Sequence, residues 1–335
     1  MENFDIAIVG AGSAGCIIAS QIIRNSNYKV LLIEAGPSDN SPVIQVPLGY
    51  GMTFYNKKMN WNFYSEVQEN LHNREIYYPR GKVLGGSGSI NAMIYARGLR
   101  SDFENWDLSK NWSWDNITRS YDEIEFEVNE NSKTLPFNKI PVNDISKQHH
   151  PILKNFFEAS KDFNFTYNKQ LKSSTENQVG NYNVNIFKGF RTSSSKVFLK
   201  PIKSNPNLTI LTKTKVLKLN CENKKILGLN IKHKNKIITV KPRIGTILSS
   251  GSIMTPYLLL KSGIGNVKDL ADHNIPLKLH SPHVGKNFQD HLGLDYLYKT
   301  YFPTLNKDLG TWSGRVKSFL QYAYNRKGPL SLSLN

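Results

Sequence analysis

Residues 4–34 read FDIAIVGAGSAGCIIASQIIRNSNYKVLLIE, and their apolar pattern indicates the class of fold. The apolar run 4–9 ends at a glycine, which predicts a buried parallel strand. Apolar side chains then recur at helical spacing, which predicts a helix over residues 13–24. A second apolar run, KVLLIE at 29–34, predicts another strand. Strand, helix and strand within about thirty residues form a βαβ unit with a right-handed crossover. The sequence therefore predicts an α/β fold with a parallel sheet.

The turn between the first strand and the helix is GAGSAG at 10–15. Gly10 permits the tight turn, Gly12 lets the backbone approach a pyrophosphate, and Gly15 lets helix and strand pack closely. The diphosphate would meet the open N–H groups and the positive end of the helix. Glu34 closes the second strand, where a carboxylate can accept hydrogen bonds from ribose hydroxyls. These residues predict a dinucleotide site, but the motif alone does not separate FAD from NAD.

The net charge of the chain is +17, from 43 Lys and Arg against 26 Asp and Glu. The lysines are scattered, as at 232, 234 and 236, whereas nucleic-acid surfaces favour clustered Arg and Lys with aromatic stacking partners. We therefore predict no nucleic-acid partner. A solvated basic surface is the first interpretation, and peripheral association with an anionic membrane is the alternative.

Two cysteines, Cys16 and Cys221, cannot build a disulfide framework, which favours a reducing, cytoplasmic setting. No stretch reaches the roughly 18 apolar residues of a spanning helix, and the strand pattern from residue 4 argues against a signal peptide. His149 and His150 are adjacent and not four residues apart, so we predict no metal site.

A second glycine-rich stretch, RGKVLGGSGSINAMIYARG at 80–98, can present backbone N–H groups to an anion or to the edge of a flavin ring. SDFENW follows it at 101–106, and GSIMTPYLLLKSGIG at 251–265 and VGKNFQDH at 284–291 come later. Together and in this order, these stretches closely resemble the signatures of the glucose–methanol–choline (GMC) oxidoreductase family. Within that family the sequence is most similar to choline dehydrogenase-like FAD alcohol dehydrogenases.

The resemblance implies an FAD site assembled from several segments. The ADP half would contact Gly10, Gly12, Ser13, Ala14, Gly15, Glu34 and Ala35, with Ser250 and Gly251 nearby and Val216 at the adenine. The diphosphate and ribityl chain would run along Arg80, Val83, Gly85, Gly86 and Ser87. The isoalloxazine ring would be reached by Asn91, Ala92, Met93 and Ile94. Some relatives carry a histidine that bonds covalently to the flavin just before the Asn91 position; Ile90 stands there, so we expect non-covalent FAD.

The family resemblance also sets an expectation for the domains. We expect an FAD-binding, Rossmann-like domain from 1–135 and 190–296, and an incomplete α+β substrate domain from 136–189 and 297–335. Polar, weakly patterned sequence from about residue 131 to 189 separates the two blocks that carry motifs.

The reaction implied by the resemblance is oxidation of a primary, choline-like alcohol, with hydride passing to flavin N5 while a histidine base takes the hydroxyl proton. That histidine is expected beyond Asn335, and the match at His291 is part of a structural turn, so no catalytic residue is assigned within the chain. The electron acceptor stays open between oxygen, a quinone and others. The alternatives are a lyase or photodecarboxylase on the same fold, or a non-catalytic flavin-binding fragment.

Overall fold

The computed structural model describes residues 3–104, 106, 112–171, 177–291, 293 and 296–332. The chain forms two compact, discontinuous units: unit 1 is Met1–Asp39, Phe54–Ile90 and Ser194–Asp295, and unit 2 is Asn40–Thr53, Asn91–Ser193 and Tyr296–Asn335. Segments 40–53 and 91–135, which we expected with the parallel sheet, therefore belong to the other compact unit. The flavin and substrate roles of the two units stay a prediction.

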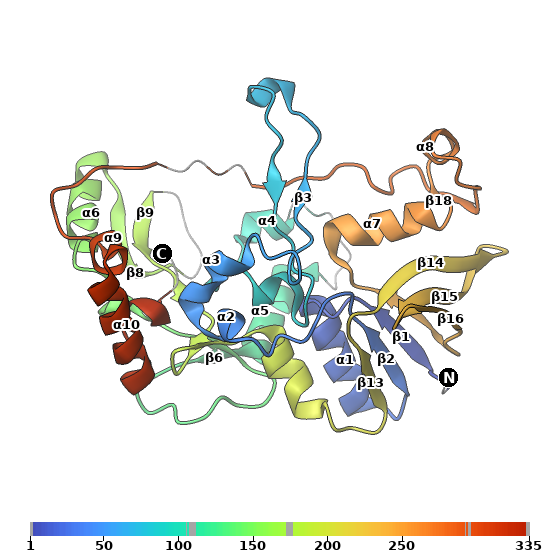
Figure 1. Cartoon of the computed structure of the whole chain (residues 1–335), viewed down its shortest axis with the longest axis horizontal. Coiled ribbons are helices and arrows are strands. Elements are labelled where there is room, and N and C mark those ends of the chain that lie inside the picture. Colours follow the sequence, from blue (N-terminus) through green and yellow to red (C-terminus); the bar gives the residue numbers. More distant parts are fainter. Residues whose placement is uncertain are drawn as a thin grey trace. The chain divides into compact units, whose positions relative to one another are not determined.

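Unit 1 contains a four-stranded sheet in the order β13-β2-β1-β17, and every neighbouring pair is parallel. Its strands are β1 (Ile6–Val9), β2 (Val30–Ile33), β13 (Leu208–Leu211) and β17 (Gly245–Leu248). Helix α1 (Ser13–Asn25) connects β1 to β2 and lies beside them in Figure 1. The predicted strand, helix and strand are thus confirmed, with each strand two residues shorter than its apolar run.

The two faces of this sheet are covered by different elements. A three-stranded antiparallel sheet consists of β14 (Lys215–Glu222), β15 (Lys225–His233) and β16 (Lys236–Val240). Val9 and Ile33 share a buried apolar cluster with Leu229 and Ile231 of that sheet. Because side chains alternate along a strand, Ile8 points to the opposite face, toward α1. Burial on both faces explains why these strands read as continuous apolar runs.

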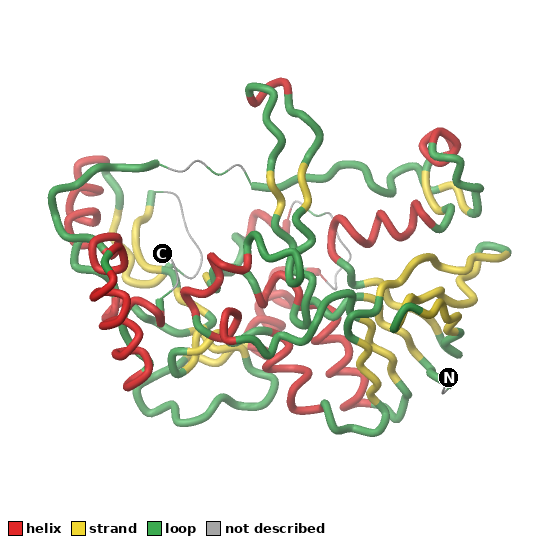
Figure 2. The backbone as a smooth tube through the Cα atoms, in the orientation of Figure 1, coloured by secondary structure: helices red, strands yellow, loops and turns green. Residues whose placement is uncertain are grey.

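Further helices and short strands complete unit 1, and Figure 2 shows the loops that connect them. They are β3 (Phe63–Tyr64), η2 (Glu69–Leu71), β4 (Tyr77–Tyr78), η3 (Gly86–Ser89), η7 (Ser195–Leu199), η8 (Lys200–Ile202), α7 (Gly251–Lys261), β18 (Ile264–Gly265), α8 (Val267–Asp272) and β19 (Leu279–His280). Strands β3 and β4 form an antiparallel pair that leads directly into Arg80.

Unit 2 has helices of different lengths, up to the 14 residues of its last α-helix, and two-stranded pairings. Its elements are α2 (Pro42–Gln45), η1 (Pro47–Gly49), α3 (Tyr50–Thr53), β5 (Ile94–Tyr95), α4 (Arg100–Glu104), α5 (Trp114–Ile124), β6 (Glu125–Glu127), β7 (Ile140–Val142), η5 (Ser146–Gln148), α6 (Leu153–Ser160), η6 (Lys161–Phe163), β8 (Thr166–Gln170), β9 (Gln178–Asn181), β10 (Asn183–Val184), β11 (Ile186–Phe187), β12 (Phe190–Arg191), α9 (Leu305–Gly310), α10 (Trp312–Asn325) and η9 (Pro329–Ser331).

The sequence predicts a helix through the acidic segment 101–130, but the described part of this segment also contains a strand. Helix α5 ends at Ile124, and β6 then pairs in parallel with β7. At the junction the Glu125 carboxylate accepts a hydrogen bond from Arg97 Nε at 2.7 Å and another from the Tyr95 hydroxyl. These partners come from a separate loop and strand, so the helical pattern could not reveal where the helix ends.

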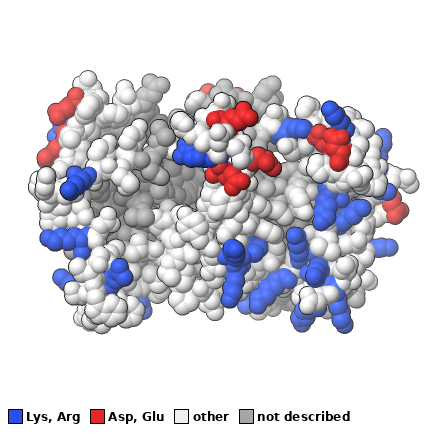
Figure 3. Space-filling view, turned by 45° about the horizontal axis from the view of Figure 1, so that its top comes forward, with Lys and Arg blue, Asp and Glu red and all other residues white. Residues whose placement is uncertain are grey.

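Among the residues described, no helix is long and apolar enough to cross a membrane, and no group of three His, Cys, Asp or Glu side chains could hold a metal ion. On the face drawn in Figure 3, Lys and Arg side chains are spread over much of the surface, and several lie together toward the lower right.

Candidate cofactor site

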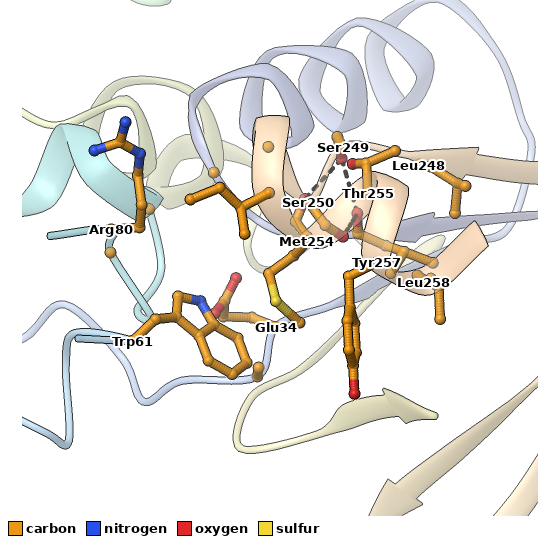
Figure 4. A pocket seen from close by; sticks show the side chains of 18 of the residues that line it. Glu34, Trp61, Arg80, Leu248, Ser249, Ser250, Met254, Thr255, Tyr257 and Leu258 are labelled. Carbon is orange, nitrogen blue, oxygen red and sulfur yellow. Dashed lines mark hydrogen bonds between the residues drawn. The ribbon is translucent and has the colours of Figure 1, made fainter. Parts of the chain in front are cut away.

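A cavity of about 650 Å³ lies in unit 1 at the carboxyl ends of three parallel strands. Val9, Ile33 and Leu248, the last residues of β1, β2 and β17, all line it. In open α/β sheets, ligands bind just beyond the carboxyl ends of the strands. Figure 4 shows Glu34, Trp61 and Met254 turned toward one another around this cavity.

The glycine turn places the amino end of α1 at the cavity. The helix begins at Ser13, its N-cap residue is Gly12, and no side chain caps it in the described structure. The backbone N–H groups of the first turn have no partner within their own helix, and the helix dipole gives this end a partial positive charge. A Cβ built on Gly12 would meet no heavy atom closer than 3.9 Å. The backbone here is therefore open to an anionic ligand.

Two other glycines bring the surrounding backbone together. A Cβ on Gly15 would lie 2.0 Å from the carbonyl oxygen of Gly10, so only glycine lets the helix sit this close to the turn. Gly86 has φ +57°, and a Cβ there would lie 2.7 Å from Gly12 Cα. The amide of Gly85 also donates to the Ala11 carbonyl at 2.8 Å. The second glycine-rich stretch is thereby held against the first.

Glu34 is buried, at 6% exposed, and lines the cavity. Its Oε2 accepts from the Ala11 amide at 3.0 Å, and its Oε1 accepts from the Gly36 amide at 2.9 Å. Burial raises the pKa of Glu34 to about 7, although these amide hydrogen bonds and nearby Lys82 act to lower it. A carboxylate has about four acceptor positions, so Glu34 keeps acceptor capacity for a ribose hydroxyl beside the amides of Ala11, Gly36 and Ala35.

The rim of the cavity carries aromatic and cationic groups that our sequence reasoning did not identify. The rings of Trp61 and Phe63 stack at 5.9 Å, and the ammonium groups of Lys82 and Lys215 lie 5.3 and 5.8 Å from the Trp61 ring centroid. Burial and the neighbouring Lys215 lower the pKa of Lys82. In the sequence, the only local indication that Trp61 lies at the cavity is its position just before the hairpin that leads to Arg80.

Most of the predicted site residues lie on this one cavity. Those that line it are Gly10, Gly12, Ser13, Ala14, Glu34, Ala35, Arg80, Gly86, Ser87, Val216, Ser250 and Gly251. Gly15, Val83 and Gly85 belong to unit 1 without lining the cavity, and Val83 is fully buried. Asn91, Ala92, Met93 and Ile94 belong to unit 2.

The cavity lining includes further residues, and the unpredicted ones come mainly from the start of α7. They are Leu248, Ser249, Ser252, Ile253, Met254, Thr255, Pro256, Tyr257 and Leu258, together with Thr214 and Lys215 before and at the start of β14. Among the residues described, no histidine lines the cavity. His291 is exposed, in a loop.

The residues present fit the ADP half of FAD. An uncapped helix end offers donors and positive charge to a diphosphate, and a buried carboxylate offers acceptors to a ribose. No side-chain atom at Gly12 blocks the approach between them.

The family model "GMC oxidoreductase" matches residues 4–293, so the chain belongs to the GMC oxidoreductase family. Members of this family are flavoproteins whose cofactor is FAD. The chain is 36% identical over 297 residues to an alcohol dehydrogenase [acceptor] of Pseudomonas putida, covering 87% of this chain and 54% of that protein. It is 32% identical over 315 residues to an oxygen-dependent choline dehydrogenase of Photobacterium profundum, covering 92% of this chain and 55% of the relative.

Solved structures agree with this family membership. Pyridoxine 4-oxidase from Mesorbium loti superimposes with a TM-score of 0.76 and 28% identity, over 84% of this chain and 56% of that one. The chain thus spans about half the length of the curated relatives that it matches.

Proposed function

We propose that this chain supplies the FAD-binding part of an oxidoreductase that acts on the CH–OH group of a primary, choline-like alcohol. The observation that supports this most is the convergence of the open α1 terminus, buried Glu34 and the second glycine-rich stretch on one cavity. The names of the related alcohol and choline dehydrogenases support the substrate class.

We propose a role for each of these residues from the geometry of the cavity. The amides at the start of α1 would hold the diphosphate, and Glu34 would accept from the adenosine ribose. Val216, at the start of β14, would contact the adenine, and Arg80 would place a cation beside the diphosphate path. Arg80 is held by an ion pair with Asp290 at 2.8 Å, which sets where its guanidinium lies.

When bound, FAD would supply the hydride acceptor for the alcohol carbon, and the protein would contribute binding, alignment and charge. By resemblance to the family, the histidine that takes the hydroxyl proton has no match among the residues of this chain. We therefore expect the 335-residue chain by itself to bind FAD and to oxidise alcohols slowly, because loss of a general base costs about 10²–10⁴ in rate.

The test is titration of the purified chain with FAD, in which quenching of flavin fluorescence measures binding and ADP and FMN serve as competitors. Saturable FAD binding that ADP displaces and FMN does not would support an ADP-directed site. Absence of saturable binding, or displacement by FMN alone, would refute it. Anaerobic mixing of the loaded chain with choline and a panel of primary alcohols then measures flavin bleaching, and rapid bleaching would show a base within the chain.

We also propose a cytoplasmic location in which the net charge of +17 gives a solvated basic surface, with peripheral association at anionic membranes as the alternative. Sedimentation with phosphatidylserine-containing vesicles at low salt, with release at high salt, would favour the alternative. Absence of sedimentation, or equal sedimentation with neutral vesicles, would contradict the alternative.

A further inference from the structure

His233, the last residue of β15, is half-buried and lies opposite the turn 212–214 that joins β13 to β14. Lys215 pairs with Lys232, so the next residue of β15 stands across from Thr214. Nδ1 of His233 lies 2.6 Å from the hydroxyl oxygen of Thr214. Thr214 is fully buried and, together with the two residues that follow it, belongs to the lining of the cavity. A histidine one residue removed from the cavity thus contacts its wall.

The second partner of Thr214 determines the direction of this hydrogen bond. Its hydroxyl oxygen lies 2.9 Å from the Thr212 carbonyl oxygen, which can only accept. A hydroxyl has a single hydrogen, so that of Thr214 donates to Thr212 and accepts from His233. Nδ1 of His233 therefore carries a hydrogen. Because one neutral form of histidine and the charged form both have an Nδ1–H, the histidine acts here as a donor whatever its charge.

The backbone of the same turn is fastened to the segment that carries Glu34. The Lys213 amide donates to the Gly36 carbonyl at 2.8 Å, and the Thr214 amide donates to the Glu34 carbonyl at 2.9 Å. Lys213 has φ +51° although it is not a glycine. Left-handed backbone at such a residue is costly and persists only where the surroundings enforce it. The turn therefore depends on its hydrogen bonds to keep its place beside Glu34.

We propose that His233 is a positioning residue for the cofactor. Its Nδ1–H holds the Thr214 side chain, and this keeps the turn 212–214 against Glu34, so that the cavity wall fits the adenosine end of FAD. The inference rests on the proposed function, because it requires a nucleotide beside Glu34. What the position requires is a donor on the atom bonded to Cγ, and not an imidazole as such. The asparagine amide Nδ2 is such a donor, whereas leucine has none.

The test compares His233→Leu with His233→Asn in the full chain. The leucine variant loses the hydrogen bond, so it should bind FAD and ADP roughly 3- to 10-fold more weakly. The asparagine variant keeps a donor and should bind both ligands within about twofold of the parent. Fluorescence titration measures the dissociation constants at a temperature where every variant is folded, and urea unfolding of the apoproteins reports their stability separately. Rescue by asparagine distinguishes a hydrogen bond from packing alone.

A second pair of variants reaches the same hydrogen bond from its other side. Thr214→Val keeps the shape of the side chain and removes the acceptor, whereas Thr214→Ser keeps the hydroxyl. Thr214→Val should weaken FAD like His233→Leu, and Thr214→Ser should bind like the parent. Because both losses concern one contact, the double variant His233→Leu with Thr214→Val should bind no more weakly than the weaker single variant.

His273→Leu is the matched control. His273 also belongs to unit 1, directly follows α8, and has its Nδ1 2.9 Å from the carbonyl oxygen of Asp269. Neither of these two residues lines the cavity. The control removes a similar donor elsewhere in the unit and should leave the dissociation constants of FAD and ADP at parental values.

The inference is overturned if His233→Leu binds FAD and ADP like the parent, or if His233→Asn loses as much affinity as His233→Leu. Losses that multiply in the double variant would show that the two residues act separately, and they overturn it as well. If His233→Leu does not fold, Thr214→Val against Thr214→Ser decides on the same criterion. A parent chain that binds neither FAD nor ADP overturns the proposed function together with this inference, whereas parental binding in all variants overturns the inference alone.

Discussion

Replacing Gly12 and Gly15 by alanine should have opposite consequences, although they lie in one turn. The Cβ of Gly12→Ala would meet its nearest atoms at 3.9 and 4.0 Å, an ordinary contact distance, and Gly12 has φ −73°, which alanine adopts freely. The Cβ of Gly15→Ala would lie 2.0 Å from a backbone oxygen. The first change adds a methyl group to the cavity surface, and the second forces helix and strand apart.

The magnitudes follow from these distances. For Gly12→Ala, the weaker N-cap costs somewhat under about 1 kcal/mol, and reduced entropy of the unfolded chain returns about 0.4–1 kcal/mol. The free energy of unfolding should therefore stay within about 0.5 kcal/mol of the parent. A methyl that displaces the diphosphate from one amide removes a hydrogen bond to a charged group, worth about 1.5–3 kcal/mol, so FAD should bind roughly 10- to 150-fold more weakly.

Gly15→Ala should lose stability first. Overpacking costs about 1–3 kcal/mol, and more against an immovable carbonyl, while alanine returns only about 1 kcal/mol of helix propensity. Urea unfolding of both apoproteins, with FAD titration by fluorescence quenching, gives the two quantities separately. If Gly12→Ala unfolds as early as Gly15→Ala, or binds FAD like the parent, then Gly12 does not face the cofactor and the reasoning fails.

Three further predictions concern the same cavity. The pKa of Glu34 is raised to about 7, so between about pH 4.5 and 7 the native state holds a proton that the unfolded state has lost. The stability that this protonated Glu34 contributes to the apoprotein should be present below pH 4.5 and lost as pH rises through 7. Over this pH range the urea midpoint of the parent should fall relative to that of Glu34→Ala. The variant should also bind FAD more weakly, by about 1–3 kcal/mol. Urea midpoints of parent and variant that change in parallel with pH would contradict the raised pKa. If the adenine stacks on Trp61, Trp61→Ala should weaken the binding of FAD and of ADP alike, by about 1–3 kcal/mol. Trp112→Ala, at a half-exposed site in unit 2, should leave the binding of both ligands unchanged. Because Ile90 offers no atom for a covalent flavin bond, acid precipitation should leave the flavin in the supernatant, and colour retained in the pellet would disprove non-covalent binding.

The βαβ unit, the glycine turn and the carboxylate that ends the second strand could all be predicted from the amino-acid sequence. These features follow local rules: a strand buried on both faces is continuously apolar, and a helix that packs on it repeats every three to four residues. Gly10 and Glu34 sit at the ends of those periodic segments, so their places at the cavity followed once the strands were identified.

The groups that surround this framework could be identified only in the folded chain. Trp61 and Lys215 meet at the cavity rim, and Arg191 reaches Asn91 across a hundred positions, because the fold brings distant loops together. No spacing rule encodes such contacts. The raised pKa of Glu34 has the same origin, since desolvation depends on every segment that covers the carboxylate and not on its neighbours in sequence.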